Sequence, residues 1–280
     1  MPLGDDWSWD ARRQAALLDG MRAVGDFQLA HFGTLDAASV REKRNARDLV
    51  TWVDTECEAR LAELLAGFVP DAGFLGEEGL RRPGRGDLLW VVDPLDGTTN
   101  YAHSLPFFAV SVALLKGREP VLGAIHAPKL GETFHGWTGG GAWLGETPLR
   151  VSDTADPGRG LFATGFADAR RLRADANLRN LGRVLHASRG VRRAGSACLD
   201  LAFTAAGRLE GYWEMGLSPW DVAAGIFLVR AAGGRVSDMA GGDRAIDGHS
   251  IIASNNHLHD WLLNSLELDP AFAGGDSALG

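Results

Sequence analysis

The chain has 280 residues, of which 45% are hydrophobic, and a formal net charge of −8 at pH 7. This length can bury a large core, in one domain or in two closely packed halves. The acidic balance disfavours a nucleic-acid partner, because phosphate backbones attract a basic surface. Two cysteines imply no disulfide framework and fit a reducing compartment.

The sequence shows neither a signal peptide nor a membrane span. Residues 1–6 are acidic and lack the basic and then apolar order of a secretory signal. The longest apolar run, residues 105–115, contains proline and serine and is too short to cross a bilayer. We therefore expect a soluble, cytoplasmic protein that does not contact membranes.

The first half of the chain predicts two helices followed by a series of strands. Apolar residues recur at helical spacing over residues 10–32, and residues 55–58 have the form of a capping box that opens a second helix. Short apolar runs between glycine and proline predict strands, several of them in antiparallel hairpins. These strands are expected at residues 74–76, 88–92, 107–115, 121–126, 132–137 and 141–144.

Beyond Pro157 strands and helices alternate, which is typical of an α/β arrangement. Strands are expected at residues 161–164, 209–214 and 250–254, and helices at 172–186, 197–206, 222–232 and 257–266. We therefore divide the chain into an N-terminal α+β half with an antiparallel sheet and the metal-binding motifs (1–155), a C-terminal α/β half (156–269) and a frayed tail (270–280). No low-complexity linker separates the halves, so they should pack as one unit.

The segment from residue 90 to 100 joins an apolar strand to two acids, a glycine and two threonines. Because Pro94 cannot donate to a strand ladder, the strand should stop near Asp93. A short helix that begins at Thr98 would point free N–H groups at Asp93 and Asp96. Hard carboxylate ligands beside such a helix start suit Mg²⁺ and a phosphate ester.

Other interpretations of this segment can be compared by spacing. Aspartyl-phosphate phosphatases need Asp-x-Asp, whereas the two acids here are three positions apart. An EF-hand that starts at Asp93 would need Gly and Glu where Thr98 and Ser104 stand. For the segment taken alone, an ordinary Asp/Pro/Gly turn is the favoured interpretation.

Taken with four further segments, the pattern resembles the inositol monophosphatase family of metal-dependent phosphomonoesterases. Residues 93–101 match the signature Asp-Pro-[Ile/Leu]-Asp-Gly-Thr-x-Asn-[Phe/Tyr], and residues 220–225 match Trp-Asp-x-Ala-[Ala/Gly]-Gly. Segments 48–54, 76–78 and 195–197 followed by 214–216 also match, in the same order. The resemblance implies a layered αβαβα sandwich of α+β and α/β character, with the active site where the two halves meet.

The resemblance also implies two Mg²⁺ ions and a third, weaker one beside Glu77. One ion would take Glu77, Asp93 and the main-chain carbonyl of Leu95. The other would take Asp93, Asp96 and Asp221, so that Asp93 bridges the two. Four carboxylates that each stand at the end of an expected element agree with such a site.

Catalytic roles follow from the same resemblance. The nucleophile would be a metal-activated water, which Asp54 and Thr98 orient and deprotonate, with Glu77 as the third catalytic residue. Lys43 matches a family position near the site, and Asp48 is expected to be a structural acid. The implied substrate-binding residues are Asp96, Gly97, Thr98, Gly195, Ser196, Ala197, Glu214 and Asp221.

The function implied is Mg²⁺-dependent hydrolysis of myo-inositol monophosphates to inositol and phosphate by a lithium-sensitive homodimer. The substrate class is a small polyol or sugar phosphate. Alternatives remain open on the same metal site, namely fructose 1,6-bisphosphate, histidinol phosphate or a nucleotide 3′-phosphate. A non-catalytic role as an RNA-polymerase accessory protein is a further alternative.

Overall fold

The computed structural model describes residues 9–34, 40–42, 49–166, 175–273 and 278–279. Three short 3₁₀ turns lie at Pro157–Arg159, Arg244–Asp247 and Pro270–Phe272. The helices in these ranges are α1 (Ala11–His31), α2 (Trp52–Ala66), α3 (Thr98–Ala102), α4 (Asp175–Ala187), α5 (Ala197–Ala205), α6 (Pro219–Ala231) and α7 (His259–Ser265).

The described strands form three sheets, of which the smallest pairs β1 (Val40–Glu42) with β2 (Leu49–Thr51). The eight-stranded sheet has the spatial order β10 (Thr147–Pro148), β9 (Gly141–Leu144), β8 (Glu132–Trp137), β7 (Glu119–Ala127), β6 (Ala109–Lys116), β5 (Leu88–Asp96), β3 (Gly73–Gly76) and β4 (Arg81–Arg82). The five-stranded sheet has the order β12 (Gly190–Arg192), β11 (Leu161–Thr164), β13 (Gly211–Met215), β15 (Ser250–Ser254) and β14 (Arg235–Ser237).

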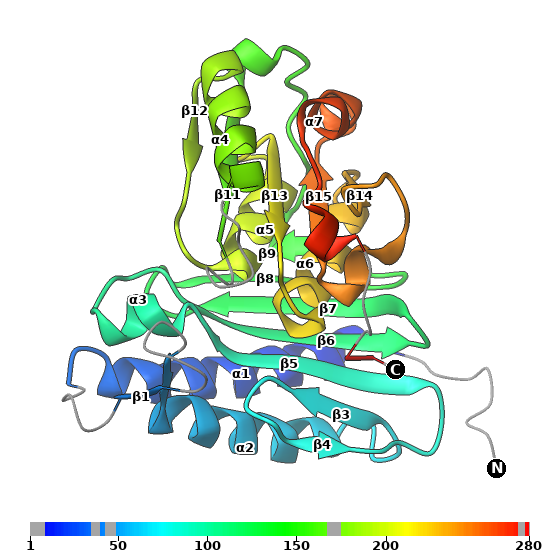
Figure 1. Ribbon diagram of the computed structural model, residues 1–280. Coiled ribbons are helices and arrows are strands. Elements are labelled where there is room, and N and C mark those ends of the chain that lie inside the picture. The colour runs from blue at the N-terminus through cyan, green and yellow to red at the C-terminus, as the bar shows by residue number, and fades with distance from the viewer. Residues whose placement is uncertain (1–8, 35–39, 43–48, 167–174, 274–277, 280) are drawn as a thin grey trace.

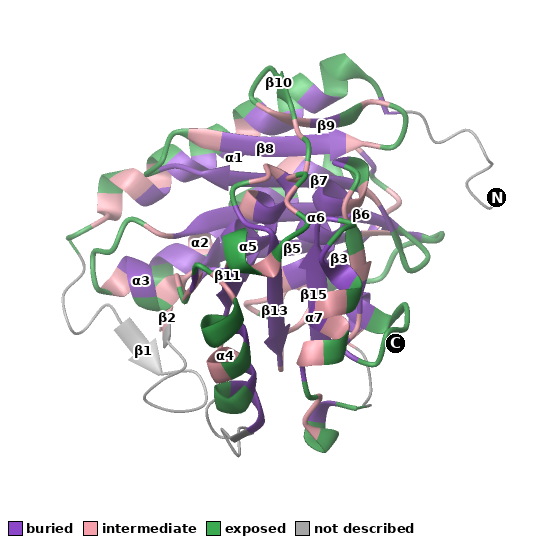
Figure 2. Cartoon of the chain, turned by 90° about the horizontal axis from the view of Figure 1, so that it is seen from above, coloured by how far each residue is buried: buried purple, intermediate pink, exposed green. Residues whose placement is uncertain are grey.

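Three buried clusters hold these elements in five layers (Figures 1 and 2). Trp90 of β5 joins the cluster that contains α1 and α2, whereas its neighbour Val91 joins the cluster that contains α5 and α6. In the other large sheet Tyr212 faces α5 and α6, and Trp213 joins the cluster that contains α4 and α7. Successive strand residues point to opposite faces, so each of the two large sheets is covered on both sides. This order confirms the predicted αβαβα sandwich.

Helix α2 begins earlier than the sequence predicts. Its capping box pairs Thr51 with Asp54, and the Asp54 carboxylate accepts the Thr51 N–H at 2.9 Å. The box predicted at residues 55–58 is therefore wrong. Thr55 donates to the Trp52 carbonyl within the first turn, and Glu58 is buried on the inner face of the helix. The sequence holds two overlapping cap-like patterns, and the earlier one forms the cap.

Strand β5 continues past the predicted stop at Asp93 and ends at Asp96, with an extra residue in its ladder. Asp93 pairs with Ser111 and Asp96 pairs with Ala109, so three steps along β5 oppose two along β6. Such a bulge shifts the alternation of faces. Leu95 accordingly joins the cluster on the α1/α2 face, as Trp90 does. Asp93 and Asp96 are thereby brought to the same face, toward α5 and α6.

Smaller differences concern edges and ends. The edge strands β12 and β14 are additional to the predicted elements. Of the predicted helix at residues 172–186, the first three residues lie outside the described ranges, and α4 begins at Asp175. Phe272 is buried against the α7 cluster, so packing extends into the segment expected as a tail. In the described ranges no helix has both the length and the apolar character needed to cross a membrane.

Candidate active site

Acidic residues from three elements meet at the end of β5. Gly76 pairs in parallel with Val92, so Glu77 leaves β3 next to Asp93. Burial, followed by the charge of Glu77, raises the pKa of Asp93 well above its usual value. For Asp221, burial and then the charges of Glu77 and Asp96 raise the pKa in the same way. A cation at this position would relieve the mutual repulsion of these acids.

Local backbone structure positions each of these carboxylates. Oδ1 of Asp93 accepts the N–H of Leu95 at 2.9 Å, which holds the bulge against the ladder. Asp221 is the third residue of α6, and its carboxylate accepts the N–H of the N-cap Ser218 at 2.7 Å. Each bond occupies one carboxylate oxygen with a donor of its own segment, so both side chains are held in a fixed orientation.

Asp96 is tied to the N-terminus of α5. Its Oδ2 accepts the N–H of Cys198 at 2.8 Å and the hydroxyl of Ser196, the N-cap of that helix. Burial raises the pKa of Asp96 to about 6, and these two hydrogen bonds limit the rise. The carboxylate therefore joins the end of β5 directly to the middle helical layer.

Asp54 and Thr98 are in direct contact. The Thr98 hydroxyl lies 2.9 Å from Oδ1 of Asp54 and 3.1 Å from the carbonyl oxygen of Leu95. The other oxygen of Asp54 accepts the Thr51 hydroxyl at 2.6 Å. Burial raises the pKa of Asp54, although the hydrogen bonds from Thr51 and Thr98 act in the opposite direction. Asp54 is thus a buried carboxylate suited to accept a proton through Thr98.

Gly97 provides the turn between β5 and α3. Its φ of 93° is a left-handed conformation, and a Cβ at this position would lie 2.7 Å from the Phe107 carbonyl oxygen. Asn100 then connects this turn to two other segments. Its side-chain amide donates to the carbonyl of Phe107, just before β6, at 2.7 Å and to the carbonyl of Ala194, just before α5, at 2.9 Å. A side chain at position 97 would therefore strain the turn.

Four of the predicted substrate residues, Gly195, Ser196, Ala197 and Glu214, lie on the other side of Asp96 from α3. Gly195 has a φ of 87° just before the N-cap Ser196, and Ala197 is the first residue of α5. Glu214 of β13 is 5% exposed and accepts a hydrogen bond from the Tyr212 hydroxyl. Burial raises the pKa of Glu214 to about 7. This side of the site combines hydroxyl, amide and carboxyl groups, which suits a polyhydroxylated ligand.

A sulfur atom borders the carboxylates. One carboxylate oxygen each from Asp93 and Asp96 and the Sγ of Cys198 all lie within 4.8 Å of one another. The thiol donates to the main-chain oxygen of Asp221 at 3.3 Å, and burial raises its pKa well above the ordinary value. A neutral thiol is a poor ligand for a hard cation, so the oxygen atoms remain the candidate metal ligands.

Contacts and electrostatic interactions connect Glu77, Asp93, Asp96 and Asp221 on one side with Ser196 and Glu214 on the other. Asp54, Thr98 and the Leu95 carbonyl form a second connected group. Lys43 and Asp48, which the sequence also suggested, lie outside the described residues.

Sequence reasoning missed two buried acids near this site. Glu58 stands one helical turn after Asp54 on the inner face of α2. Asp200 is 2% exposed on α5, and burial followed by the charge of Glu214 raises its pKa well above the usual value. Each is an acid in a helical position otherwise occupied by apolar residues, and that pattern is the signal that could have found them.

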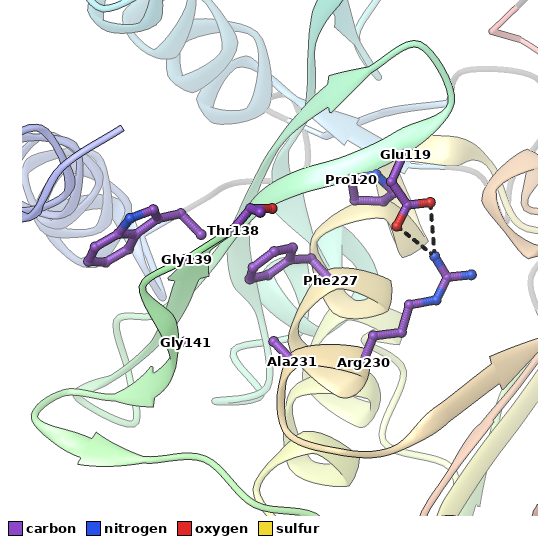
Figure 3. A pocket seen from close by; sticks show the side chains of 9 residues that line it. Glu119, Pro120, Thr138, Gly139, Gly141, Phe227, Arg230 and Ala231 are labelled. Atoms are coloured by element: carbon purple, nitrogen blue, oxygen red, sulfur yellow. Dashed lines mark hydrogen bonds and ion pairs between the residues drawn. The ribbon is translucent and has the colours of Figure 1, made fainter. Parts of the chain in front are cut away.

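A separate cavity of about 260 Å³ lies between the β7–β8 region and α6. Phe227 projects from the helix into it, and the ion pair between Arg230 and Glu119, 3.2 Å long, closes one side (Figure 3). None of the predicted site residues lines this cavity. It is therefore distinct from the acidic site.

Comparison with known proteins agrees with this geometry. Residues 14–269 match the model of the inositol monophosphatase family. The chain is 42% identical over 233 residues to the inositol-1-monophosphatase of Synechocystis sp., covering 82% of this chain and 81% of that protein. It is 35% identical over 240 residues to the fructose-1,6-bisphosphatase/inositol-1-monophosphatase of Thermotoga maritima, covering 86% of this chain and 90% of that protein. The crystal structure of the extragenic suppressor protein suhB from Bartonella henselae is similar with a TM-score of 0.85 at 36% identity, covering 92% of this chain and 99% of that chain. The chain therefore belongs to the inositol monophosphatase family.

Proposed function

We propose that the protein is a Mg²⁺-dependent phosphomonoesterase that hydrolyses myo-inositol monophosphates to inositol and phosphate. The observation that carries this proposal is the meeting of the buried Asp93 and Asp96 with the half-buried Asp221. Burial, together with the charges of neighbouring acids such as Glu77, raises the pKa values of all three. No ion pair between described side chains neutralises these three acids. Membership of a phosphatase family supports the same conclusion.

The donor set fits Mg²⁺. Carboxylate and carbonyl oxygens are hard ligands, which Mg²⁺ prefers. We assign Glu77, Asp93 and the Leu95 carbonyl to one ion, and Asp93, Asp96 and Asp221 to the other, with a third weak site beside Glu77. When bound, Mg²⁺ would neutralise the phosphoryl oxygens and lower the pKa of the attacking water.

The remaining catalytic work belongs to Asp54 and Thr98. The Thr98 hydroxyl can donate to Asp54 and accept a hydrogen bond from the attacking water, so a proton can pass from water through Thr98 to the carboxylate. Three hydrogen bonds to Asp54 from Thr51 and Thr98 fix its orientation for this transfer. Glu77 contributes by setting the charge next to Asp93.

Substrate binding is assigned to groups on both sides of Asp96. The first N–H groups of α3, at Gly97 and Thr98, have no acceptor within the helix and would hold the phosphate. Ser196 and Glu214 would hydrogen-bond ring hydroxyls, with Gly195, Ala197, Asp96 and Asp221 completing the pocket wall. A polyol presents several hydroxyl donors, which suit a wall rich in carboxylates.

Further properties are proposed on the same basis. A site built for Mg²⁺ can be occupied by Li⁺, so lithium should inhibit the enzyme. We also propose a homodimer in the cytoplasm. Fructose 1,6-bisphosphate is a second candidate substrate, because the Thermotoga maritima relative carries both activities in its name.

The test is phosphate release from a panel of esters with and without Mg²⁺. The panel contains inositol 1-phosphate, fructose 1,6-bisphosphate, histidinol phosphate and adenosine 3′,5′-bisphosphate, and the Asp96→Asn variant is the blank. Preference for inositol 1-phosphate would support the proposal, and preference for another ester would replace the substrate but keep the metal chemistry. No Mg²⁺-dependent release from any ester would contradict catalysis and favour a binding role such as an RNA-polymerase accessory protein.

A further inference from the structure

Glu58 uses both of its carboxylate oxygens to hold the loop that carries Glu77. Oε2 accepts the N–H of Glu78 at 2.8 Å, and Oε1 accepts the N–H of Leu80 at 2.9 Å. The side chain is only 4% exposed and comes from α2, twenty residues before the loop that it binds. A buried carboxylate that accepts two backbone N–H groups is strongly oriented, because each bond is charge-assisted.

Two backbone hydrogen bonds restrain this loop in addition to its contacts with Glu58. The N–H of Gly76 donates to the Leu80 carbonyl at 3.0 Å, which closes the turn, and the N–H of Glu77 donates to the Val92 carbonyl at 3.2 Å. The turn is therefore attached to β5 on one side and to Glu58 on the other. Between these two attachments lies Glu77, which the parallel pairing of Gly76 with Val92 places next to Asp93.

Gly76 makes room for the anchor. A Cβ at this position would lie 2.1 Å from Oε2 of Glu58 and 2.5 Å from its Cδ. The carboxylate thus occupies the space that a side chain of residue 76 would fill. Any larger residue at 76 would displace Glu58 from the loop, which provides a second way to break the same contact without changing the acid.

We propose that Glu58 is a positioning residue that fixes Glu77 for Mg²⁺ binding. Asp54 and Glu58 are one turn apart on the inner face of α2, so one helix orients both the proton acceptor and a metal ligand. Without Glu58 the turn keeps its bond to Val92 but loses both bonds to α2. Glu77 then samples positions away from Asp93, and the ion that both residues share binds less tightly. This inference rests on the proposed function, in which Glu77 is a metal ligand.

The experiment is a calorimetric titration of the substrate-free enzyme with Mg²⁺, together with kcat at saturating Mg²⁺. Glu58→Gln keeps the shape of the side chain but replaces one acceptor oxygen with an amide that cannot accept. We expect Kd for Mg²⁺ to rise roughly 10-fold, as for other residues that orient a metal ligand. Because Glu58 itself does not touch substrate, kcat should recover toward the wild-type value when Mg²⁺ is saturating. Glu63→Gln, an exposed acid on the same helix, is the matched control and should leave Kd unchanged.

Two further variants separate positioning from general stability. Gly76→Ala should also raise Kd for Mg²⁺. If Glu58→Gln does not fold, this variant tests whether Glu58 positions Glu77. In a Glu77→Gln background, Glu58→Gln should cause no additional loss of Mg²⁺ affinity, because residues that act through one group are not additive.

The possible results distinguish this inference from the proposed function. If wild-type protein binds Mg²⁺ and the Glu58→Gln and Gly76→Ala variants bind it with the same Kd, Glu58 serves only stability and the inference is overturned. An additive loss in the Glu77→Gln background also overturns it. If the wild-type protein does not bind Mg²⁺, the proposed function fails, and the inference fails with it.

Discussion

The Ser196 hydroxyl donates a hydrogen bond to Asp96, a residue 100 positions earlier in the chain. The N–H of Cys198 donates to the same carboxylate oxygen at 2.8 Å. Asp96 therefore caps the start of α5 while it ends β5, and the two bonds fix the distance between the large sheet and the middle helices. Both bonds end on the same oxygen, Oδ2, so the orientation of the Asp96 carboxylate is fixed.

Asp96→Asn should reduce kcat/KM roughly 100-fold or more while the fold persists. The amide oxygen can still accept the bonds from Ser196 and Cys198, but the charge that holds the cation is lost. Mg²⁺-dependent phosphate release measures the loss of activity, and circular dichroism checks that the fold persists. Asp153→Asn, which changes an acid whose side chain is 74% exposed, should behave as wild type. A rate close to wild type in Asp96→Asn would contradict the assigned metal site.

Thr98→Val should lower kcat by about 100-fold to 10,000-fold, the usual range for loss of a proton-transfer group. The substitution keeps the shape of the side chain but removes the hydroxyl that contacts Asp54. Thr98→Ser, which keeps the hydroxyl, should retain most of the activity, and Thr99→Val at the exposed neighbour is the control. Steady-state kinetics at saturating Mg²⁺ measure the effect, and equal rates for Val and Ser at position 98 would remove Thr98 from the proton path.

The metal-free protein should become less stable as the pH rises from about 4.5 to about 7, in part through Glu214. Burial raises the pKa of this carboxyl from 4.5 to about 7, so the folded state binds a proton that the unfolded state has released. The resulting stabilisation is present at low pH and is lost as the pH rises through the folded pKa. Its size is on the order of 3 kcal/mol, at about 1.4 kcal/mol for each pKa unit.

Denaturant unfolding at several pH values, in the presence of a chelator, tests this expectation. Glu214→Gln should flatten the decline, since the amide does not titrate and can still accept the Tyr212 hydroxyl. An equally steep decline in the Glu214→Gln variant would show that other groups, such as Asp96, carry the effect.

Gly97→Ala should cost both stability and activity. The left-handed backbone strains alanine, and its Cβ would meet the Phe107 carbonyl oxygen at 2.7 Å. A loss of about 1–3 kcal/mol is expected, with a fall in kcat/KM because the turn positions Thr98. Gly117→Ala is a matched control, because it has a positive φ of 60° but open space around the added Cβ. It should lose less stability and keep its activity. Equal losses in both variants would mean that the contact with Phe107 is unimportant.

The sequence predicted those parts of the structure that local chemistry determines. The order of the main strands and helices, and the placement of Asp93, Asp96 and Asp221 near element ends, follow from apolar periodicity and caps, whereas the layered fold was implied by the family resemblance of the signature motifs. The family assignment and the αβαβα sandwich are confirmed. The roles of the individual site residues remain predictions.

What the sequence did not reveal depends on contacts between distant segments. Glu58 appeared to be part of a helix cap because Thr55 and Glu58 have cap spacing. Only the loop after β3, brought next to α2 by pairing with β5, gives that acid its partners. The edge strands β12 and β14 are three residues each, too short for periodicity to identify.

Because of the bulge at the end of β5, the active site depends on the number of residues between Asp93 and Asp96 as well as on which residues they are. Up to Asp93 the pairs with β6 follow one register, and after the bulge the pair of Asp96 with Ala109 follows a register shifted by one residue. This shift determines which face of the sheet each side chain points to. Removing one residue between Asp93 and Asp96 would leave every acid present, yet it would turn one of the two toward the apolar layer of α1 and α2. The segment from Asp93 to Asp96 should therefore tolerate a substitution more readily than an insertion or a deletion. The spacing of the two aspartates is itself a functional element of the chain.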